Sequence, residues 1–123
     1  MRTEGPRAAA SVCVVIPVKD DANELRRCLR ALALQTQRPD QIIVVDNMSS
    51  DESAEVARSA GADVIRCDRP GIPAAAAAGY DAASADLILR LDADCVPAGS
   101  WVAAMSSAAD AHPEASVFAG GAR

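Results

Sequence analysis

The chain alternates between two patterns of hydrophobic and polar positions. One pattern is a short, almost continuous run of Val, Ile and Leu, which is typical of a strand buried on both faces of a sheet. Five runs of this kind occur, at Val12–Ile16, Gln41–Asp46, Asp63–Arg66, Leu87–Asp92 and Ala115–Phe118. We expect each of them to form a strand.

The segments between these runs have the period of a helix. After the first run, apolar residues recur at positions i, i+3, i+4 and i+7, which places them on one helix face. They are Leu25, Cys28, Leu29 and Leu32. Asp21 and Glu24 have the spacing of a capping box at the start of this helix, and Pro39 lies beyond its end.

Three further helices are predicted from similar signals. Ser49 and Glu52 repeat the capping spacing before a second helix, and Gly61 would end it. Pro73 suits the first turn of a third, Ala-rich helix, and a fourth covers Ser100 to about Ala111. Strands that alternate with helices predict an α/β domain of three layers, with a doubly wound, mostly parallel sheet and right-handed crossovers.

Charged side chains follow the strands of this predicted sheet. Lys19 and Asp20 come just after the first strand, Asp46 ends the second, and Asp92 and Asp94 lie at the end of the fourth. Ligands of such sheets bind outside the carboxyl ends of the strands. We therefore expect these side chains to share one rim of the sheet and to form the candidate site.

The triplet Asp92-Ala93-Asp94 is the best candidate for a metal site. In a turn, both carboxylates can reach one hard cation, and Mg²⁺ or Mn²⁺ commonly takes one or two carboxylates together with phosphate oxygens and water. An acidic turn exposed to solvent, with Asp94 as a cap, is the alternative interpretation. The triplet alone does not decide between the two.

Composition narrows the class of protein without naming a function. Half of the 123 residues are apolar and 24% are charged, which is typical of one globular domain. The net charge of −5 argues against nucleic acid as a partner. The four cysteines form no CxxC pair, so we expect reduced thiols in a cytoplasmic protein, or in one held peripherally at the inner face of the membrane. No apolar run reaches the ~18 residues of a membrane span.

Three stretches resemble family 2 glycosyltransferases of the GT-A fold. VVIPVKDDANELRRCLRAL is similar to the first strand and helix of that family, and IIVVDNMSSDES to its second strand and acidic loop. ADVIRCDRPGIPAAAAAGYDAASADLILRLDADCVPAGSW is similar to the next helix, the fourth strand and the DxD motif, with the Pro and Trp beyond it. The order and spacing hold from Val12 to about Phe118. The resemblance implies the Rossmann-like, nucleotide-sugar-binding half of the GT-A fold.

The resemblance also implies a nucleotide site in the first two loops. Asp46 corresponds to the acidic residue that hydrogen-bonds the nucleotide base. The loop after Pro17 corresponds to the segment that encloses the base, and Lys19 and Asp20 stand in it where the family usually has Tyr-Asn. That replacement puts base stacking in question, while Lys19 is the nearest cation for the donor.

For the fourth strand, the resemblance implies contact with the ribose and the diphosphate of the donor. Asp92 and Asp94 correspond to the pair that does this, with Mn²⁺ or Mg²⁺ as the cofactor. The implied donor is a UDP- or GDP-sugar. The implied reaction transfers its sugar to an unknown acceptor hydroxyl, with inversion by direct displacement.

Two further departures from the family pattern bear on this expectation. The usual Arg-Asn of the third helix is replaced by Ala76 and Ala77, which removes a cation and an amide from the donor site. Met48 stands where Gly is usual in the acidic loop, and a positive φ there would disfavour Met.

We expect residues 1–10 to be a flexible N-terminal segment and residues 11–123 to form the nucleotide-sugar-binding half-domain. In the family the chain continues into an acceptor-binding half that carries the catalytic base. No base is therefore nominated, and we expect donor binding without turnover by this chain alone. A second copy, or a complementing second half, is the expected protein partner.

A non-catalytic nucleotide-binding or interaction module with a degenerate form of the same fold is the alternative function, which Ala76 and Ala77 favour. A phospho-receiver domain is disfavoured, because it needs a lysine after the fifth strand and none follows Lys19. Trp101 is expected to anchor a helix face, and His112 to be a loop residue rather than a metal ligand.

Overall fold

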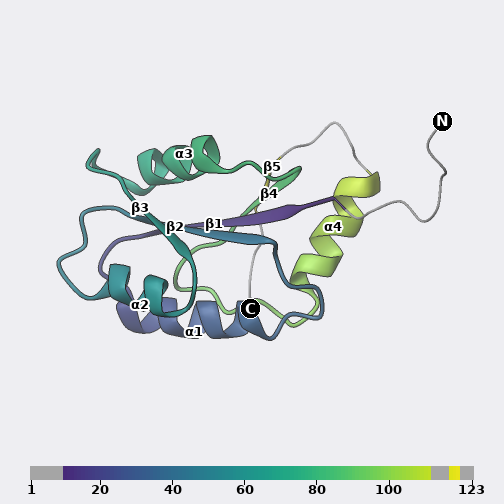
Figure 1. Cartoon of the computed structure of the whole chain (residues 1–123), viewed down its shortest axis with the longest axis horizontal. Helices are drawn as coiled ribbons and strands as arrows, with labels where there is room; N and C mark the ends of the chain where they lie inside the picture. The colour runs from purple at the N-terminus through teal and green to yellow at the C-terminus, as the bar shows by residue number, and fades with distance from the viewer. Residues whose placement is uncertain (1–9, 112–116, 120–123) are drawn as a thin grey trace.

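Strands and helices alternate along the residues that the computed structural model describes, 10–111 and 117–119. The elements are β1 (Val12–Val18), α1 (Ala22–Ala33), β2 (Gln41–Asp46), α2 (Ser53–Ser59), β3 (Asp63–Arg66), α3 (Ile72–Ala82), β4 (Leu87–Arg90), α4 (Trp101–Ala111) and β5 (Val117–Ala119). All strand pairs are parallel, in the order β3-β2-β1-β4-β5. The predicted doubly wound α/β architecture is confirmed (Figure 1).

Strand boundaries differ from the prediction by a few residues. β1 continues to Val18, because its pairing with β2 runs on until Val18 faces Asp46. β4 ends at Arg90, two residues early, since the chain turns at Asp92. The predicted last strand corresponds to β5, and residues 115 and 116 lie outside the described part of the chain, as do residues 1–9 of the predicted N-terminal segment.

Helices cover both faces of the sheet and complete the three layers. One core cluster joins alternate residues of β1, including Val12, Val14 and Ile16, to α1, α2 and the start of α4. A second cluster joins the other β1 residues, Cys13 and Val15, to α3. In Figure 1, α3 lies on one side of the strands while α1 and α2 lie on the other. The predicted burial on both faces is therefore confirmed for β1, whereas β2 and β4 are partly buried and β3 contains no buried residue.

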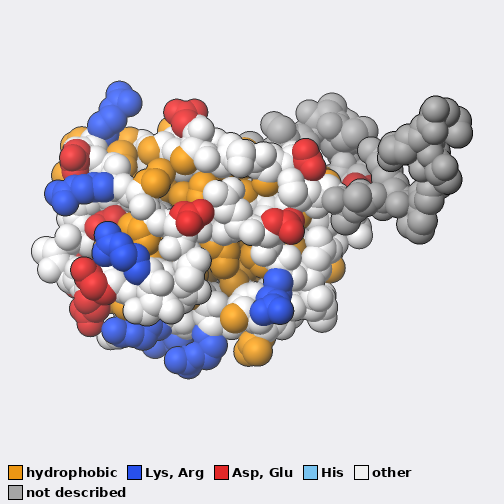
Figure 2. Space-filling model, viewed as in Figure 1, with side chains coloured by type: hydrophobic (Ala, Val, Ile, Leu, Met, Phe, Trp, Pro, Cys, Tyr) orange, Lys and Arg blue, Asp and Glu red, His pale blue; other side chains and the backbone are white. Residues whose placement is uncertain are grey.

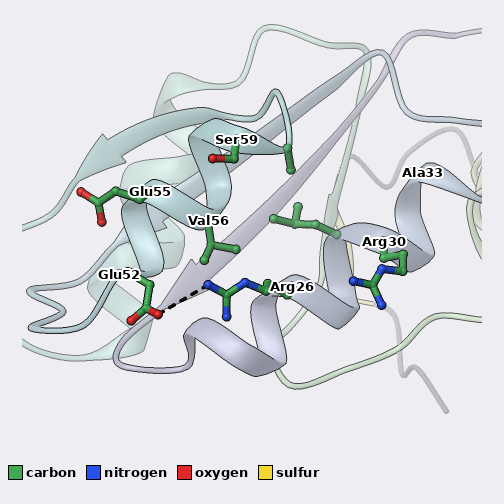
Figure 3. A pocket seen from close by; sticks show the side chains of 9 residues that line it. Arg26, Arg30, Ala33, Glu52, Glu55, Val56 and Ser59 are labelled. Carbon is green, nitrogen blue, oxygen red and sulfur yellow. Dashed lines mark hydrogen bonds and ion pairs between the residues drawn. The ribbon is translucent and has the colours of Figure 1, made fainter.

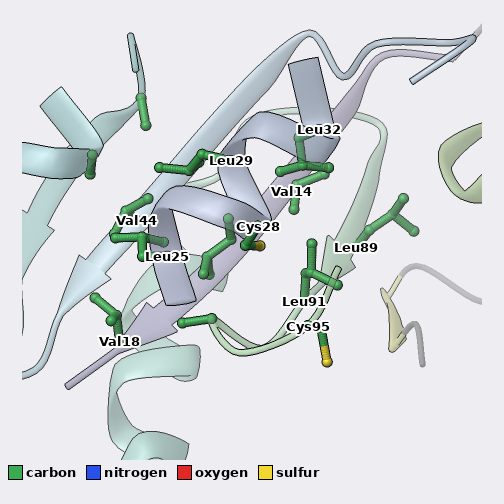
Figure 4. Close-up of a cluster of buried hydrophobic side chains, with 14 of the residues drawn as sticks. Val14, Val18, Leu25, Cys28, Leu29, Leu32, Val44, Leu89, Leu91 and Cys95 are labelled. Carbon is green, nitrogen blue, oxygen red and sulfur yellow. The ribbon is translucent and has the colours of Figure 1, made fainter. Parts of the chain in front are cut away.

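The predicted apolar stripe of α1 is confirmed. Leu25, Cys28, Leu29 and Leu32 are each at most 5% exposed. Figure 4 shows these side chains turned toward the sheet, next to Val14, Val44 and Leu89. At about 25 cal/mol per Å² of apolar surface removed from water, this stripe is the main force that fixes α1 against the sheet.

The predicted capping boxes are wrong, because a different carboxylate holds both helix starts. Neither Asp21 nor Glu52, the residues before α1 and α2, makes a capping hydrogen bond with its side chain. Instead Asp51 accepts from the Ser53 N–H at 3.0 Å with Oδ1 and from the Ala22 N–H at 3.1 Å with Oδ2. One carboxylate therefore ties the first residues of α1 and α2 together.

The third helix lies unusually close to the sheet. A Cβ placed on Gly79 would be 2.3 Å from Val15 Cγ1 and 3.0 Å from Val45 Cγ2, so only glycine fits there without a shift. Pro73 lies in the first turn of α3, as predicted. Ala76 is buried and Ala77 is exposed, so neither brings a polar group to the sheet.

The surface carries both signs of charge. On the face shown in Figure 2, acidic and basic side chains are interspersed, and apolar side chains gather between the layer of α3 and the layer of α1 and α2. No basic patch for nucleic acid stands out on that face. Within the described residues, every helix is too short or too polar to cross a bilayer.

Candidate functional site

The predicted site residues lie at the carboxyl ends of the parallel strands. The chain moves from β1 to β2 and β3 on one side of the sheet, and β4 and β5 lie on the other side. The order therefore reverses between β1 and β4, which is where α/β sheets bind ligands. A cavity of about 210 Å³ lies there, lined by Pro17, Lys19, Asp21, Ile72, Asp92, Ala93 and Asp94.

The cavity brings together four of the six predicted site residues. Pro17 and Lys19 come from the end of β1, and Asp92 and Asp94 follow β4. Asp20 and Asp46 are not part of its wall. The structure adds Asp21, which the sequence analysis treated only as a helix cap.

Asp92 and Asp94 stand in a turn, as predicted. The Cys95 N–H donates to the Asp92 carbonyl at 3.0 Å, which closes the turn. Ala93 and Cys95 are buried under it, while the two carboxylates are exposed. One ligand atom from each of Asp92, Asp94 and Cys95 lies within 4.8 Å of the others.

This donor set fits a hard divalent cation. The exposed carboxylates supply oxygen, the ligand that Mg²⁺ and Mn²⁺ prefer, and the third group is a buried thiol of softer character. Arg90 pairs with Asp92 Oδ1 at 3.3 Å and leaves the second oxygen of that carboxylate available. Asp94 has no hydrogen bond or ion pair with any residue of the described part.

Lys19 supplies a positive charge to the lining of the cavity. It is exposed and forms no ion pair within residues 10–111. A lysine ammonium can meet a phosphate oxygen as a point charge. The cavity lining thus combines a cation with two carboxylates, a set that suits a diphosphate bridged by a metal.

Asp21 adds a third carboxylate to the lining of the cavity. Its burial raises the pKa of Asp21 above the ordinary value, and the charges of Glu24, Asp94, Asp51 and Asp20 raise it further. The crowding of negative charge favours a positive ligand at this position.

Asp20 holds the first loop to the second. It has a positive φ of 56°, and its N–H donates to Ser49 Oγ at 3.0 Å. Its Oδ1 accepts from the Ser50 N–H at 2.7 Å, from Ser50 Oγ at 3.3 Å and from the Asp51 N–H at 3.3 Å. This oxygen is therefore occupied by the protein itself.

The loop after β2 begins at Asp46, at the end of the strand. Asp46 Oδ1 accepts from the Ser49 N–H at 3.0 Å, so the carboxylate closes its own loop with one oxygen. Met48, between them, has a φ of 61°. Position 48 therefore has the positive φ that was considered because the family usually has glycine there, and in this chain Met adopts this left-handed conformation.

Asn47 is a structural residue of this rim that the sequence analysis missed. It is 1% exposed, and its Nδ2 donates to the Cys67 carbonyl at 3.1 Å and to the Arg69 carbonyl at 2.8 Å. These bonds hold the loop after β3 against the loop after β2. The only signal in the sequence was a polar residue at a strand end.

The remaining candidates have structural positions. Trp101 is 8% exposed in the core cluster that contains α1, so its predicted role as an anchor is confirmed. Cys13 and Cys28 are buried in the core, as predicted, and burial raises the pKa of Cys13 to about 11 and that of Cys28 to about 12. His112 lies outside the described residues.

A larger hollow of the described surface lies elsewhere. It measures about 490 Å³ between α1 and α2, and none of the predicted site residues lines it. In Figure 3 the ion pair of Arg26 with Glu52, 3.5 Å long, crosses from one helix to the other. The walls of this hollow are mainly side chains of α1 and α2, none of which was predicted to be a site residue.

Comparison with known sequences identifies relatives over most of the chain. A family model described as glycosyl transferase family 2 matches residues 13–122. Glycosyltransferase AglE of Haloferax volcanii is 34% identical over 99 residues, a region that is 74% of this chain and 33% of AglE. The chain thus spans about a third of the length of this curated relative.

Solved structures share the fold. Glucosyl-3-phosphoglycerate synthase of Mycobacterium tuberculosis, in complex with Mn²⁺, uridine-diphosphate and glucosyl-3-phosphoglycerate, matches with a TM-score of 0.67 at 20% identity, over 84% of this chain and 44% of that one. TarS of S. aureus matches with a TM-score of 0.72 at 19% identity, over 84% of this chain and 20% of its own. At these identities the likeness establishes the architecture.

Proposed function

Because the chain belongs to glycosyl transferase family 2, we propose that it binds a nucleotide-diphospho-sugar through a divalent cation, for transfer of the sugar to an acceptor hydroxyl. The observation that carries the proposal is the cavity at the reversal of strand order, whose lining includes Asp92, Asp94 and Lys19. The presence of Mn²⁺ and uridine-diphosphate in a structural neighbour supports it.

In this proposal the turn after β4 holds the cation. Asp94 and the second oxygen of Asp92 are its protein ligands, and Lys19, in the same cavity, neutralises the diphosphate. Mn²⁺ and Mg²⁺ both suit the carboxylates. When bound, the cation would stabilise the negative charge that builds on the leaving diphosphate.

The nucleotide would extend from this cavity toward the loops after β1 and β2. Pro17 lines the cavity, and Asp46 has one carboxylate oxygen that is not used by the Ser49 N–H. That oxygen is the acceptor we propose for the base of a UDP- or GDP-sugar. Asp20 acts mainly by fixing the loop, because its Oδ1 is taken by Ser50 and Asp51.

The proposal also covers the catalytic step, the protein partner and the cellular location. The catalytic step is inversion by direct displacement, and its base and the acceptor site belong to residues outside the described rim. A complementing half would supply them, and a second copy of the chain is the other protein partner that we propose. We propose a cytoplasmic protein, free or held peripherally at the inner face of the membrane, where the donor would be available.

A binding titration with matched variants tests the donor site. UDP and GDP are titrated into the 123-residue chain by calorimetry, with and without Mn²⁺. We expect binding that requires Mn²⁺ and weakens by about 10-fold or more, or about 1.4 kcal/mol, in Asp92→Asn and Asp94→Asn. Asp81→Asn is the control. Asp81 is exposed on α3, so this substitution removes the same charge at a position away from the cavity.

Two results would contradict the proposal. One is the absence of binding of either nucleotide at millimolar concentration. The other is binding that is the same in the Asp92→Asn, Asp94→Asn and Asp81→Asn variants and indifferent to Mn²⁺, which would favour the non-catalytic module. That second candidate function draws on Ala76 and Ala77, neither of which has a polar group to offer the donor.

A further inference from the structure

The two metal-binding candidates belong to a segment without helix or strand. Residues 91–100 connect β4 to α4. Their side chains alternate between the core and solvent, so that Ala93 and Cys95 are buried while Asp92, Asp94 and Val96 are exposed. A segment of this kind has no ladder of its own, and its position depends on what holds its ends.

Helix α1 and the chain just after it contact both ends of this segment. At the start, Cys28 Sγ lies 3.9 Å from the Asp92 carbonyl oxygen. Near the end, Gln35 Nε2 donates to the Ala98 carbonyl at 2.7 Å. Cys28 belongs to α1, and Gln35 lies two residues after Ala33, the last residue of that helix.

The Gln35 amide is fixed in a single orientation. Its Oε1 accepts from the Val102 N–H at 3.0 Å, and its Nε2 donates to the Ala98 and Ala31 carbonyls at 2.7 and 3.3 Å. A flipped amide would set donors against the Val102 N–H and an oxygen against two carbonyls. Because Gln35 is only 6% exposed, water does not replace these bonds.

The same amide also serves the start of α4. Val102 is the second residue of that helix, and its N–H is among those that have no partner within the helix. Gln35 Oε1 supplies the missing acceptor from another element. Beside it, the Thr36 N–H donates to the Gly99 carbonyl at 2.9 Å.

We propose that Gln35 is a positioning residue for the proposed donor site. It touches neither the cavity nor its carboxylates, but through Ala98 and Val102 it fixes the far end of the segment that carries Asp92 and Asp94. This inference rests on the proposed function for its meaning. Without the Gln35 bonds, the protein still folds and keeps its sheet. The turn that carries Asp92 and Asp94 is then no longer held in one position, and it binds metal and nucleotide more weakly.

The first measurement needs no ligand. Amide hydrogen exchange is followed by mass spectrometry in Gln35→Met, Gln35→Glu and the control Gln37→Met. Gln37 also bonds to α4, through Ser106 Oγ at 3.2 Å, but its side chain forms no hydrogen bond with residues 91–100. We expect exchange about 10-fold faster in residues 92–102 of Gln35→Met, with residues 41–46 of β2 unchanged. Gln35→Glu keeps an acceptor for Val102 and loses the bond to Ala98, so its change is confined to residues 92–100.

The second measurement links this change to binding. The affinity for Mn²⁺ with UDP is expected to fall about 10-fold in both Gln35 variants and to stay unchanged in Gln37→Met. The inference is overturned if residues 92–100 of Gln35→Glu exchange at the same rate as in the unmodified chain. If Gln35→Met does not fold, this measurement on Gln35→Glu alone is the test. Altered exchange with normal affinity also overturns it. If the unmodified chain fails to bind Mn²⁺ and UDP, the proposed function fails, whatever the exchange shows.

Discussion

The loops after β1 and β2 and the loop after β4 share one rim of the sheet, but they use their carboxylates differently. In the first two loops Asp20, Asp46 and Asp51 all accept hydrogen bonds from backbone N–H groups. After β4, among the residues that the structure describes, the Asp92 carboxylate accepts only from the Arg90 side chain and the Asp94 carboxylate accepts from none.

This difference shows that acidity at a strand end has two physical causes. A carboxylate can satisfy the orphan N–H groups of a tight loop or helix start, and then it is part of the scaffold. A carboxylate that no N–H occupies keeps its lone pairs for a ligand. By this criterion the turn after β4 is the better candidate for a cation, and Asp20 is mainly a brace between loops.

Among substitutions at these loops, Asp20→Ala is expected to have the largest effect on the free energy of unfolding. The change removes the acceptor of the Ser50 and Asp51 N–H groups and places alanine at a φ of 56°. We expect the free energy of unfolding to fall by about 2 kcal/mol in a urea titration. Asp20→Asn, which keeps an acceptor and tolerates this φ, should lose less than half as much. Equal losses would show that the charge, and not the loop geometry, matters.

A gain in stability is expected from Met48→Gly. Met48 has a φ of 61°, where a residue with a Cβ is strained by about 1–2 kcal/mol and glycine is not. The greater freedom of glycine in the unfolded chain offsets part of the gain, so we expect about +0.5 to +1 kcal/mol. A lower midpoint of thermal unfolding in Met48→Gly would mean that the Met48 side chain makes contacts that outweigh the strain.

Asp51→Ala is expected to cost about 1 kcal/mol at pH 7, as the loss of a helix cap usually does. The hydrogen bond from the Ser53 side chain, followed by those from backbone N–H groups, lowers the pKa of Asp51. A lowered pKa in the folded state stabilises the protein above the unfolded value of about 3.9, and that stabilisation is lost as the pH falls through the folded pKa. The difference between the two proteins should therefore shrink below about pH 4, and a difference constant with pH would contradict it.

The smallest effect on folding is expected at the turn after β4. Asp92→Asn and Asp94→Asn should each change the free energy of unfolding by less than about 0.5 kcal/mol without metal, since neither carboxylate holds the backbone. Removal of the crowding with Asp21 could even give a small gain. A loss as large as that of Asp20→Ala would abolish the distinction between the two loops.

Most of the fold was predictable because it depends on patterns that repeat. The apolar runs of β1 and β2 and the stripe of α1 are local signals with a strand or helix period, and they were correct to within two residues at most boundaries. The DxD turn was also predictable, since its residues are adjacent in sequence and lie at a strand end.

The features that could not be predicted depend on contacts between distant residues. Ser49 and Glu52 have the spacing of a capping box, yet Asp51 holds the starts of both α1 and α2, because Ala22 is brought beside it by the sheet. Gln35 gave no sequence signal, since its partners Ala98 and Val102 are more than 60 positions away. The roles of Asp46 and of Asp94 in binding stay predictions.

The central place of β1 has a consequence for the synthesis of the chain. Cys13 pairs with Gln41 on one side, while Val12 pairs with Leu87 on the other. At about 5–20 residues per second, several seconds separate the appearance of these partners from the ribosome. During that interval one edge of an apolar strand is exposed, which favours chaperone binding and misassociation. The cavity between β1 and β4 is therefore completed late, when β4 docks.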